Sequence, residues 1–215
     1  MSTVAVIDYG MGNIRSVSKA LEYVGGDTSV IITYDPDQIL KADRVVFPGV
    51  GALGDCMEEI KRLGLDEVIK ECTRTKPFFG ICLGMQALLD NSEENDGTSG
   101  LGIIPGKVKH FDVRLGRKEL KEKLKIPHMG WNRVDQTSPH ALWEGVPDLS
   151  RFYFVHSYYV EPRHSQVVSG TTKYGFAFTS AIASENIFAT QFHPEKSQHA
   201  GLTLFANFLR WDGTG

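Results

Sequence analysis

The sequence has few cysteines, no long apolar run and no excess of positive charge, and each absence excludes a class of protein. Its three cysteines in 215 residues cannot all pair, and they are far too sparse for a disulfide scaffold. No apolar run approaches the roughly 18 residues that span a bilayer. The 23 Lys and Arg against 26 Asp and Glu give a net charge of −3, without the basic footprint of a nucleic-acid-binding protein. We therefore expect a reduced, cytoplasmic protein that binds neither nucleic acid nor membranes.

Strand-like and helix-like segments alternate over about the first 100 residues. Residues 3–7 form a short apolar run that ends at Asp8, which predicts a first strand and not a signal peptide. Further apolar runs predict strands at 28–33, 44–47 and 77–82. Amphipathic spacing predicts helices at 14–24 (with Asn13 as N-cap), 53–63, 65–73 and 83–89. Apolar strands that alternate with helices are typical of a parallel sheet covered on both faces.

The pattern changes after Leu101. Strand-like segments follow without helices long enough for crossovers, so antiparallel pairing is expected for 107–113, 129–134, 152–160, 167–172 and 176–184. A last amphipathic helix is predicted at 197–211. No repeat or low-complexity linker divides the chain. We predict a single α/β domain over residues 1–215: a mostly parallel central sheet with helices on both faces and an antiparallel strand extension.

Residues 107–125 form a basic stretch, with eight Lys and Arg against three acidic residues. A solvated hairpin or loop is the favoured interpretation of such a run of charges. A basic rim that steers an anionic partner or substrate is the alternative.

The candidate nucleophile is Cys82, in the segment Gly80-Ile81-Cys82-Leu83-Gly84 between a predicted buried strand and a predicted helix. A cysteine at a strand end is by itself more often inert and buried. Glycines two residues before and two residues after it, however, fit a nucleophile elbow, a turn so tight that neighbouring side chains must be small. Such a turn presents the thiol at the carboxyl edge of the sheet, where the N-terminus of the next helix favours the thiolate.

A thiolate nucleophile needs a base, and the base needs a group that orients it. His193 and Glu195, in the segment Gln191-Phe192-His193-Pro194-Glu195, can supply both. A residue before proline favours extended backbone, in which side chains two apart point the same way, so we expect Glu195 beside His193. No other histidine has a carboxylate at this spacing after an apolar strand, and an exposed or core position is expected for His110, His128, His140, His156, His164 and His199.

A second turn, Pro48-Gly49-Val50-Gly51, ends another strand at the same predicted edge of the sheet. Backbone flanked by glycines can aim an N–H group at a developing oxyanion there. Without Cys82 nearby, an ordinary strand-to-helix turn would be the favoured interpretation.

Two other kinds of site are not predicted. Cys56 and Cys72 lie on predicted helices with no Cys or His at metal-ligand spacing, so we expect no metal site. The segment Tyr9-Gly10-Met11-Gly12-Asn13 lacks the third glycine of the dinucleotide fingerprint, because position 15 is Arg, so we expect no NAD binding.

Together these segments closely resemble the class I (triad-type) glutamine amidotransferases, and within them the family of glutaminase subunits of imidazole glycerol phosphate synthase, from histidine biosynthesis. The resemblance runs essentially from end to end. The Cys82 and His-Pro-Glu motifs mark the class. Three segments narrow it to this subunit: Asp8-Tyr9-Gly10-Met11-Gly12-Asn13, His128-Met129-Gly130-Trp131-Asn132 and His156-Ser157-Tyr158-Tyr159. The basic stretch before Pro127 looks longer than the family usually has.

The resemblance implies a flavodoxin-like fold and a role for each matching residue. Cys82 attacks the glutamine side-chain amide, and His193, held by Glu195, activates the thiol and protonates the leaving ammonia. Backbone N–H groups that stabilise the oxyanion come from Leu83 and from the strand Gly49, Val50 and Gly51. Positions that hold glutamine match Gly51, Gln86, Glu94, Ser157 and Tyr158. No cofactor is needed for this half-reaction.

The resemblance also implies a partner, a (β/α)8-barrel cyclase subunit. Ammonia passes through a tunnel to a phosphorylated carboxamide–aminoimidazole ribulose intermediate, giving imidazole glycerol phosphate and an aminoimidazole carboxamide ribotide. The region of the family that faces the barrel matches Tyr9, Asn13, Arg15, Trp131, Tyr153 and Lys196.

Three alternatives stay open from the sequence. A paralogue with the same glutaminase chemistry would deliver ammonia to another acceptor, such as a nucleotide sugar. A stand-alone γ-glutamyl peptidase on this scaffold would need a larger cleft and activity without a partner. A non-catalytic binding or regulatory protein with this fold would usually lose the cysteine or the histidine, and both are present.

Overall fold

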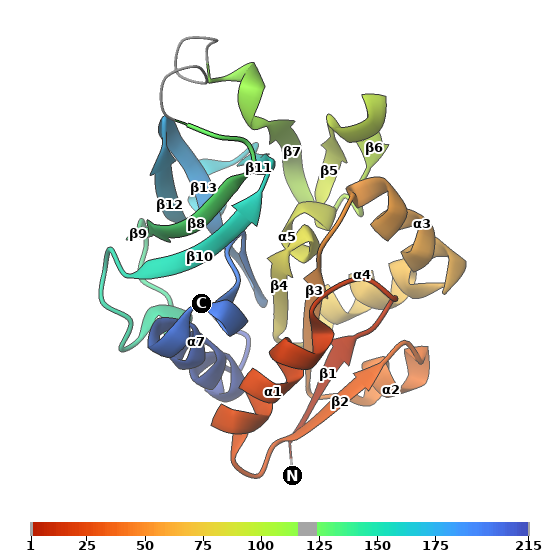
Figure 1. The fold of residues 1–215 in the computed structure, drawn as a ribbon. Helices are drawn as coiled ribbons and strands as arrows, with labels where there is room; N and C mark the ends of the chain where they lie inside the picture. The colour runs from red at the N-terminus through yellow and green to blue at the C-terminus, as the bar shows by residue number, and fades with distance from the viewer. Residues whose placement is uncertain (1, 116–123, 215) are drawn as a thin grey trace.

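The computed structural model describes residues 2–115 and 124–214, and a parallel sheet forms its centre (Figure 1). In spatial order the parallel strands are β2 (Ser29–Thr33), β1 (Thr3–Ile7), β3 (Arg44–Gly49), β4 (Phe78–Cys82) and β14 (Ile187–Thr190). Strand β4 is buried along its whole length. It therefore lies in the middle of the sheet with helices on both sides, as its continuous apolar sequence indicates.

Helices cover both faces of this sheet. One face carries α1 (Ile14–Gly25) and α7 (Gln198–Arg210), which lie side by side in Figure 1. The other carries α2 (Pro36–Lys41), α3 (Leu53–Arg62), α4 (Leu65–Thr75) and α5 (Leu83–Ala87). Alternate residues of β1 divide between the two cores: Val4 and Val6 pack on the α1 side, and Ala5 and Ile7 on the α3 side. The predicted α/β fold class is confirmed.

Beyond β14 the sheet continues as the predicted strand extension. Strand β13 (Phe176–Ser184) pairs antiparallel with β14 and with β11 (Tyr158–Pro162), which pairs antiparallel with β7 (Ile104–His110). The edge is formed by β5 (Leu89–Ser92) and β6 (Thr98–Ser99), while β12 (Val168–Tyr174) and β9 (Asp135–Gln136) branch off β13. The pairing is antiparallel except between β5 and β7, which run parallel.

A separate two-stranded antiparallel sheet is formed by β8 (His128–Arg133) and β10 (Arg151–His156). In Figure 1 it lies in front of β12 and β13. We call this pair of strands the small sheet. Short 3₁₀ turns complete the described chain: η1 (Glu94–Asp96), η2 (Phe111–Val113), η3 (Ala141–Trp143), η4 (Ser165–Val167) and η5 (Pro194–Lys196).

Several predicted elements were wrong in extent. The helix predicted at 83–89 ends at Ala87, and its last predicted residue begins β5. The single strand predicted at 152–160 is two strands in two different sheets, because the alternation of buried residues breaks at Ser157. The strand predicted at 107–113 is β7 followed by the turn η2. Asn13 precedes α1 as predicted, but its side chain makes no capping hydrogen bond.

The basic stretch at 107–125 falls partly outside the described residues, which omit 116–123. Within its described part, Lys109 and Arg114 both approach the carboxylate of Glu161, at 2.6 and 3.7 Å. No helix in the described ranges has the length and apolarity that a membrane crossing requires.

Candidate active site

Cys82 lies at the junction between β4 and α5 in a backbone conformation that side chains rarely adopt. Its φ of 54° and ψ of −106° fall outside the common regions, and such a conformation costs about 1–3 kcal/mol. The neighbouring glycines make the turn possible. A β-carbon on Gly84 would overlap the carbonyl of Phe47, and one on Gly80 would lie 3.1 Å from the β-carbon of Ala189. The strained turn and the two close approaches have the geometry of a nucleophile elbow.

The side chains of His193 and Glu195 lie against each other in the interior. His193 Nδ1 and Glu195 Oε1 are 2.9 Å apart, and the two side chains are 2% and 1% exposed. The expectation of extended backbone holds only for His193, because residues 194–196 form the 3₁₀ turn η5. Ser197 Oγ donates to the carbonyl of His193 at 2.6 Å, and the backbone N–H of His193 donates to Tyr153 at 2.9 Å. These bonds fix the segment that carries the histidine.

The surroundings of His193 favour its protonated form. Burial by itself lowers the pKa of His193, but the nearby Cys82 thiolate and the hydrogen-bonded Glu195 carboxylate raise it to about 10. The other ring nitrogen, Nε2, has no hydrogen-bond partner among the described residues. At neutral pH His193 therefore carries a proton that it can transfer.

The other two cysteines have a different environment. Cys56 on α3 and Cys72 on α4 are fully buried, and none of the three cysteines forms a disulfide in the described structure. Burial raises the pKa of Cys56 to about 12 and that of Cys72 to about 11. Both thiols are thus protonated and unreactive at neutral pH.

A cavity of about 310 Å³ opens beside Cys82. Small-molecule sites are typically about 300–1,000 Å³, so this one suits a ligand of amino-acid size. The predicted residues that line it are Val50, Gly51, Leu83, Gln86, Glu94, Ser157 and Tyr158. Sequence reasoning missed three further lining residues, Pro127, Val155 and His156. The structure thus brings all five predicted glutamine-binding positions to one cavity with Cys82.

The predicted oxyanion residues lie on both sides of Cys82. Gly49 ends β3 directly beside Cys82 in the parallel pairing, and Leu83 begins α5. Gly51 has a φ of 104°, and a β-carbon there would lie 2.9 Å from the side chain of Met11. Only glycine fits that position without strain. Val50 is 37% exposed at the cavity.

Two polar side chains of the cavity are held by the protein. Glu94 Oε2 accepts from the backbone N–H of Leu53, at the start of α3, at 2.6 Å. Gln86 donates its amide N–H groups to the carbonyl of Tyr158 at 3.3 Å and to Gln191 Oε1 at 3.0 Å. Its own amide oxygen is the atom left for a ligand.

Gln191 is a residue of the site that sequence reasoning missed. It is fully buried, and its Nε2 lies 3.6 Å from the sulfur of Cys82. A polar residue inside the apolar run that precedes His193 was the available signal, because buried amides need partners.

The predicted partner-facing residues separate into three groups. Trp131, Tyr153 and Lys196 gather on one surface: the two rings are 6.1 Å apart, and Lys196 Nζ lies 5.6 Å from the Tyr153 ring. Asn13 and Arg15 are exposed at the start of α1. Tyr9 is a correction, because its side chain is 2% exposed and packs on Phe47 in the core.

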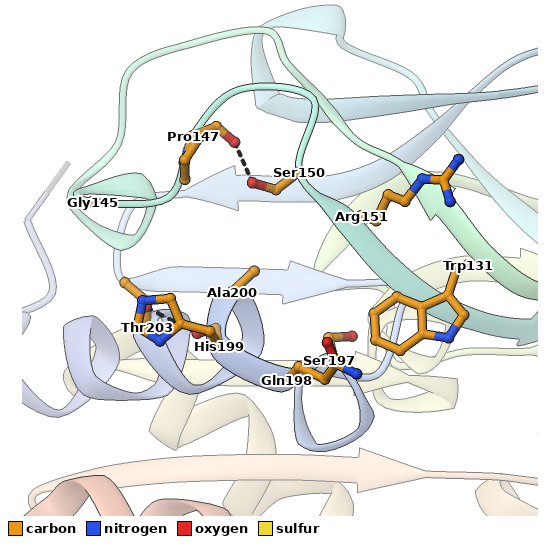
Figure 2. Close-up of a pocket in the computed structure, with 10 residues that line it drawn as sticks. All are labelled: Trp131, Gly145, Pro147, Ser150, Arg151, Ser197, Gln198, His199, Ala200 and Thr203. Atoms are coloured by element: carbon orange, nitrogen blue, oxygen red, sulfur yellow. Dashed lines mark hydrogen bonds between the residues drawn. The ribbon is translucent and has the colours of Figure 1, made fainter.

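A second hollow of about 470 Å³ adjoins Trp131 (Figure 2). Figure 2 shows Trp131 and Arg151 of the small sheet on one side of it, with the first residues of α7 on another. The hollow therefore continues the surface that carries the predicted partner-facing residues. In the part of the chain that the structure describes, no cluster of His, Cys, Asp and Glu is arranged to hold a metal ion.

This fold and site define a class of enzyme. The family model "Glutamine amidotransferase class-I" matches residues 5–211, and the chain belongs to that family. Solved structures share the fold at low identity. PurLQS from Thermotoga maritima superposes with a TM-score of 0.71 at 17% identity, covering 97% of this chain and 98% of that one. The glutaminase domain of Trypanosoma brucei CTPS, with bound acivicin, gives 0.64 at 16% identity, covering 99% and 95%.

Curated relatives give the particular family. Imidazole glycerol phosphate synthase subunit HisH of Nitrosococcus oceani is 57% identical, over 99% of both chains. HisH of Thiobacillus denitrificans is 56% identical, over 97% of this chain and 91% of the relative, and HisH 1 of Pseudomonas aeruginosa is 55% identical, over 99% of both. The chain belongs to the HisH family, the glutaminase subunits of imidazole glycerol phosphate synthase in histidine biosynthesis. The resemblance found in the sequence motifs is confirmed.

Proposed function

We propose that Cys82, His193 and Glu195 hydrolyse the side-chain amide of glutamine. The observation that carries this proposal is the opening of one cavity beside Cys82, together with the buried His193–Glu195 pair, whose histidine interacts with Cys82. The thiolate attacks the amide carbon, and His193 Nε2 gives its proton to the leaving ammonia. A water molecule then loses a proton to His193 and attacks the thioester, which releases glutamate and restores the thiolate and the protonated histidine.

The same cavity offers groups for each part of the substrate. The carboxylate of Glu94 suits the α-ammonium group of glutamine, and the amide oxygen of Gln86 can accept a hydrogen bond. Ser157, Tyr158 and Gly51 contribute mainly through backbone. The N–H of Leu83 and one from the strand Gly49, Val50 and Gly51 stabilise the oxyanion. No step in this scheme uses a cofactor.

The partner proposed for this subunit is a (β/α)8-barrel cyclase that receives the ammonia through a tunnel. The surface cluster of Trp131, half-buried Tyr153 and Lys196, with Asn13 and Arg15 at the start of α1, is proposed to meet it. We further propose that residues 1–215 act as one domain and work in the cytoplasm. The free thiols are consistent with that reducing compartment.

The deciding experiment measures glutamine hydrolysis by the chain alone, by the chain with the barrel cyclase, and by that complex with its nucleotide ligand. We expect a slow lone chain and strong activation in the complex, because free ammonia is lost unless an acceptor is in place. In the lone chain the Gly49–Val50 peptide can turn its N–H away from the oxyanion, since the glycines make such a flip cost little free energy. The loss of one oxyanion donor lowers the rate of hydrolysis about 10²–10³-fold.

The control for this experiment is Cys82→Ala, which should hydrolyse no glutamine yet still bind the partner. Full activity of the lone chain, unchanged by partner and ligand, would favour the stand-alone peptidase. Ammonia release by pure Cys82→Ala would remove Cys82 from the mechanism.

A further inference from the structure

The side chain of Gln191 is a fully buried amide in contact with the sulfur of Cys82. Its Nε2 lies 3.6 Å from Sγ, and its Oε1 accepts from Gln86 Nε2 at 3.0 Å. Both ends of the amide therefore have partners, as burial requires. The functional question is which end faces the sulfur, since N–H would stabilise a thiolate and oxygen would repel it.

The backbone carbonyl of Tyr158 answers this question, because a carbonyl can only accept hydrogen bonds. The side-chain amide of Gln86 lies 3.3 Å from that oxygen, so the amide atom that faces it must be the nitrogen, Nε2, which donates. The same nitrogen donates to Gln191, which must present its oxygen in return. The N–H groups of Gln191 are then left on the side of Cys82.

The same carbonyl fixes a pair of buried histidines on its other side. His156 Nδ1 lies 2.7 Å from the Tyr158 oxygen and must donate to it, so His156 Nε2 is an acceptor. His128 Nδ1 then donates to His156 Nε2 at 2.9 Å, and Asn132 Nδ2 donates to His128 Nε2 at 3.2 Å. Each ring has one possible tautomer.

Burial keeps both of these rings neutral. It lowers the pKa of His128 to about 4 and that of His156 to about 3. The two lone pairs of the Tyr158 oxygen are thus filled by one imidazole and one amide, and neither donor changes its protonation near neutral pH. A single pattern of hydrogen bonds runs from the small sheet, at Asn132, to the sulfur of Cys82.

We propose that Gln191 is a further catalytic residue of this glutaminase, which donates an N–H to the sulfur of Cys82 and stabilises the thiolate. Gln86 and the Tyr158 carbonyl are its positioning groups, since they hold the amide with nitrogen toward the sulfur. The proposal rests on the proposed function of Cys82 as nucleophile. It adds a donor of fixed direction beside a developing negative charge, where a hydrogen bond is stronger than between neutral groups.

The test measures the thiolate directly, without turnover. Iodoacetamide labelling of Cys82 is followed by peptide mass spectrometry between pH 5 and 9, in wild type, Gln191→Leu and Gln191→Glu. A hydrogen bond to a charged group changes an equilibrium by about tenfold or more. We therefore expect Gln191→Leu to raise the midpoint of the pH profile by about one unit, and to lower the labelling rate about tenfold at pH values below the wild-type midpoint.

Gln191→Glu is the second variant, and it keeps the shape of the side chain. It can still accept from Gln86, but it places a carboxylate against the sulfur, so the midpoint of its pH profile should rise further than that of Gln191→Leu. The other titratable groups around the sulfur and its cavity are present in every variant: His193, Glu195, Tyr9, Glu94, His156 and Tyr158.

The matched control is Gln136→Leu, which removes a glutamine that bonds to the Val146 carbonyl outside this network and should label like wild type. The proposal is overturned if both Gln191 variants show the same labelling pH profile as the wild type. If Gln191→Leu does not fold, an unchanged profile in Gln191→Glu overturns it by itself. Glutamine hydrolysis by Cys82→Ala separates the two ideas. If that variant is inactive while the Gln191 variants label normally, the role of Gln191 fails and the proposed function stands.

Discussion

Replacing Gly49 by alanine tests how closely the candidate oxyanion strand is packed. Gly49 ends β3 beside Cys82, and an added β-carbon would overlap the hydroxyl of Tyr9 and lie 3.0 Å from the β-carbon of Leu83. The φ of Gly49 is not among the positive values, so alanine can adopt this backbone and the cost is steric. Because the Tyr9 hydroxyl is the closest obstacle, Tyr9→Phe should relieve part of the overlap.

The expected free energies follow from this geometry. Overpacking of this kind costs about 1–3 kcal/mol, so Gly49→Ala should lower the free energy of unfolding by that amount. The Tyr9 hydroxyl is buried and has no hydrogen-bond partner among the described residues, so Tyr9→Phe should cost little or even stabilise. In the double variant we expect the free energy of unfolding to fall by about 1–2 kcal/mol less than the sum of the two single-variant decreases. The contact with Leu83 remains, so the rescue should be incomplete.

The assay is urea unfolding of the wild type, both single variants and the double variant, with glutamine hydrolysis measured on the same samples. A double-mutant cycle cancels the effect of alanine on the unfolded chain, because that effect is the same in both backgrounds. Tyr23→Phe is the control background, since that ring is 79% exposed and its hydroxyl should show no coupling to Gly49→Ala. Additive losses in the Tyr9→Phe background, within about 0.5 kcal/mol, would refute the reasoning.

Three further predictions follow from the site and its surroundings. An electrophilic glutamine analogue should label Cys82 and leave the two buried helix cysteines unmodified, as read by peptide mass; equal labelling of all three would show that Cys82 has no special environment. His193→Asn should lower glutamine hydrolysis by several orders of magnitude, whereas Glu195→Gln should cost less because it keeps the orienting hydrogen bond; wild-type activity of Glu195→Gln would remove that residue from the triad. Burial lowers the pKa of His140 to about 4, so the folded state binds fewer protons than the unfolded state and stability is lost as pH falls below about 6.5. The loss reaches about 2 kcal/mol at pH 5. His140→Asn can still accept from the Leu142 N–H and should lose about that much less between pH 7.5 and pH 5 in urea unfolding; an unchanged pH dependence would contradict the assignment.

The sequence by itself determined the features that depend on neighbours along the chain. Apolar runs that alternate with amphipathic spacing predicted the central parallel sheet, because residue periodicity directly encodes which face of an element is buried. The glycines around Cys82 predicted its tight turn for a similar local reason, since only small neighbours allow α5 to lie against β3. The motifs also placed the chain in its family.

Other features depended on how distant segments pair. Tyr9 matched a partner-facing position by motif, yet its side chain is buried in the core. Side chains one residue apart along a strand point to opposite faces of the sheet, so a shift of one residue moves a side chain from one face to the other. The break at Ser157, which divides a β-rich run into strands of two sheets, leaves no mark in β-propensity.

The contact between Gln191 and Cys82 shows the tertiary contribution most clearly. The two residues are 109 positions apart, and neither segment indicates that it contacts the other. They meet because β14 pairs in parallel with β4 in a register that sets Thr190 beside Ile81. That register follows from the packing of the whole sheet. The direction of the Gln191 amide then depends on a third segment, through the carbonyl of Tyr158. Hydrogen bonds between distant segments carry no local periodicity, so only the folded structure could reveal them.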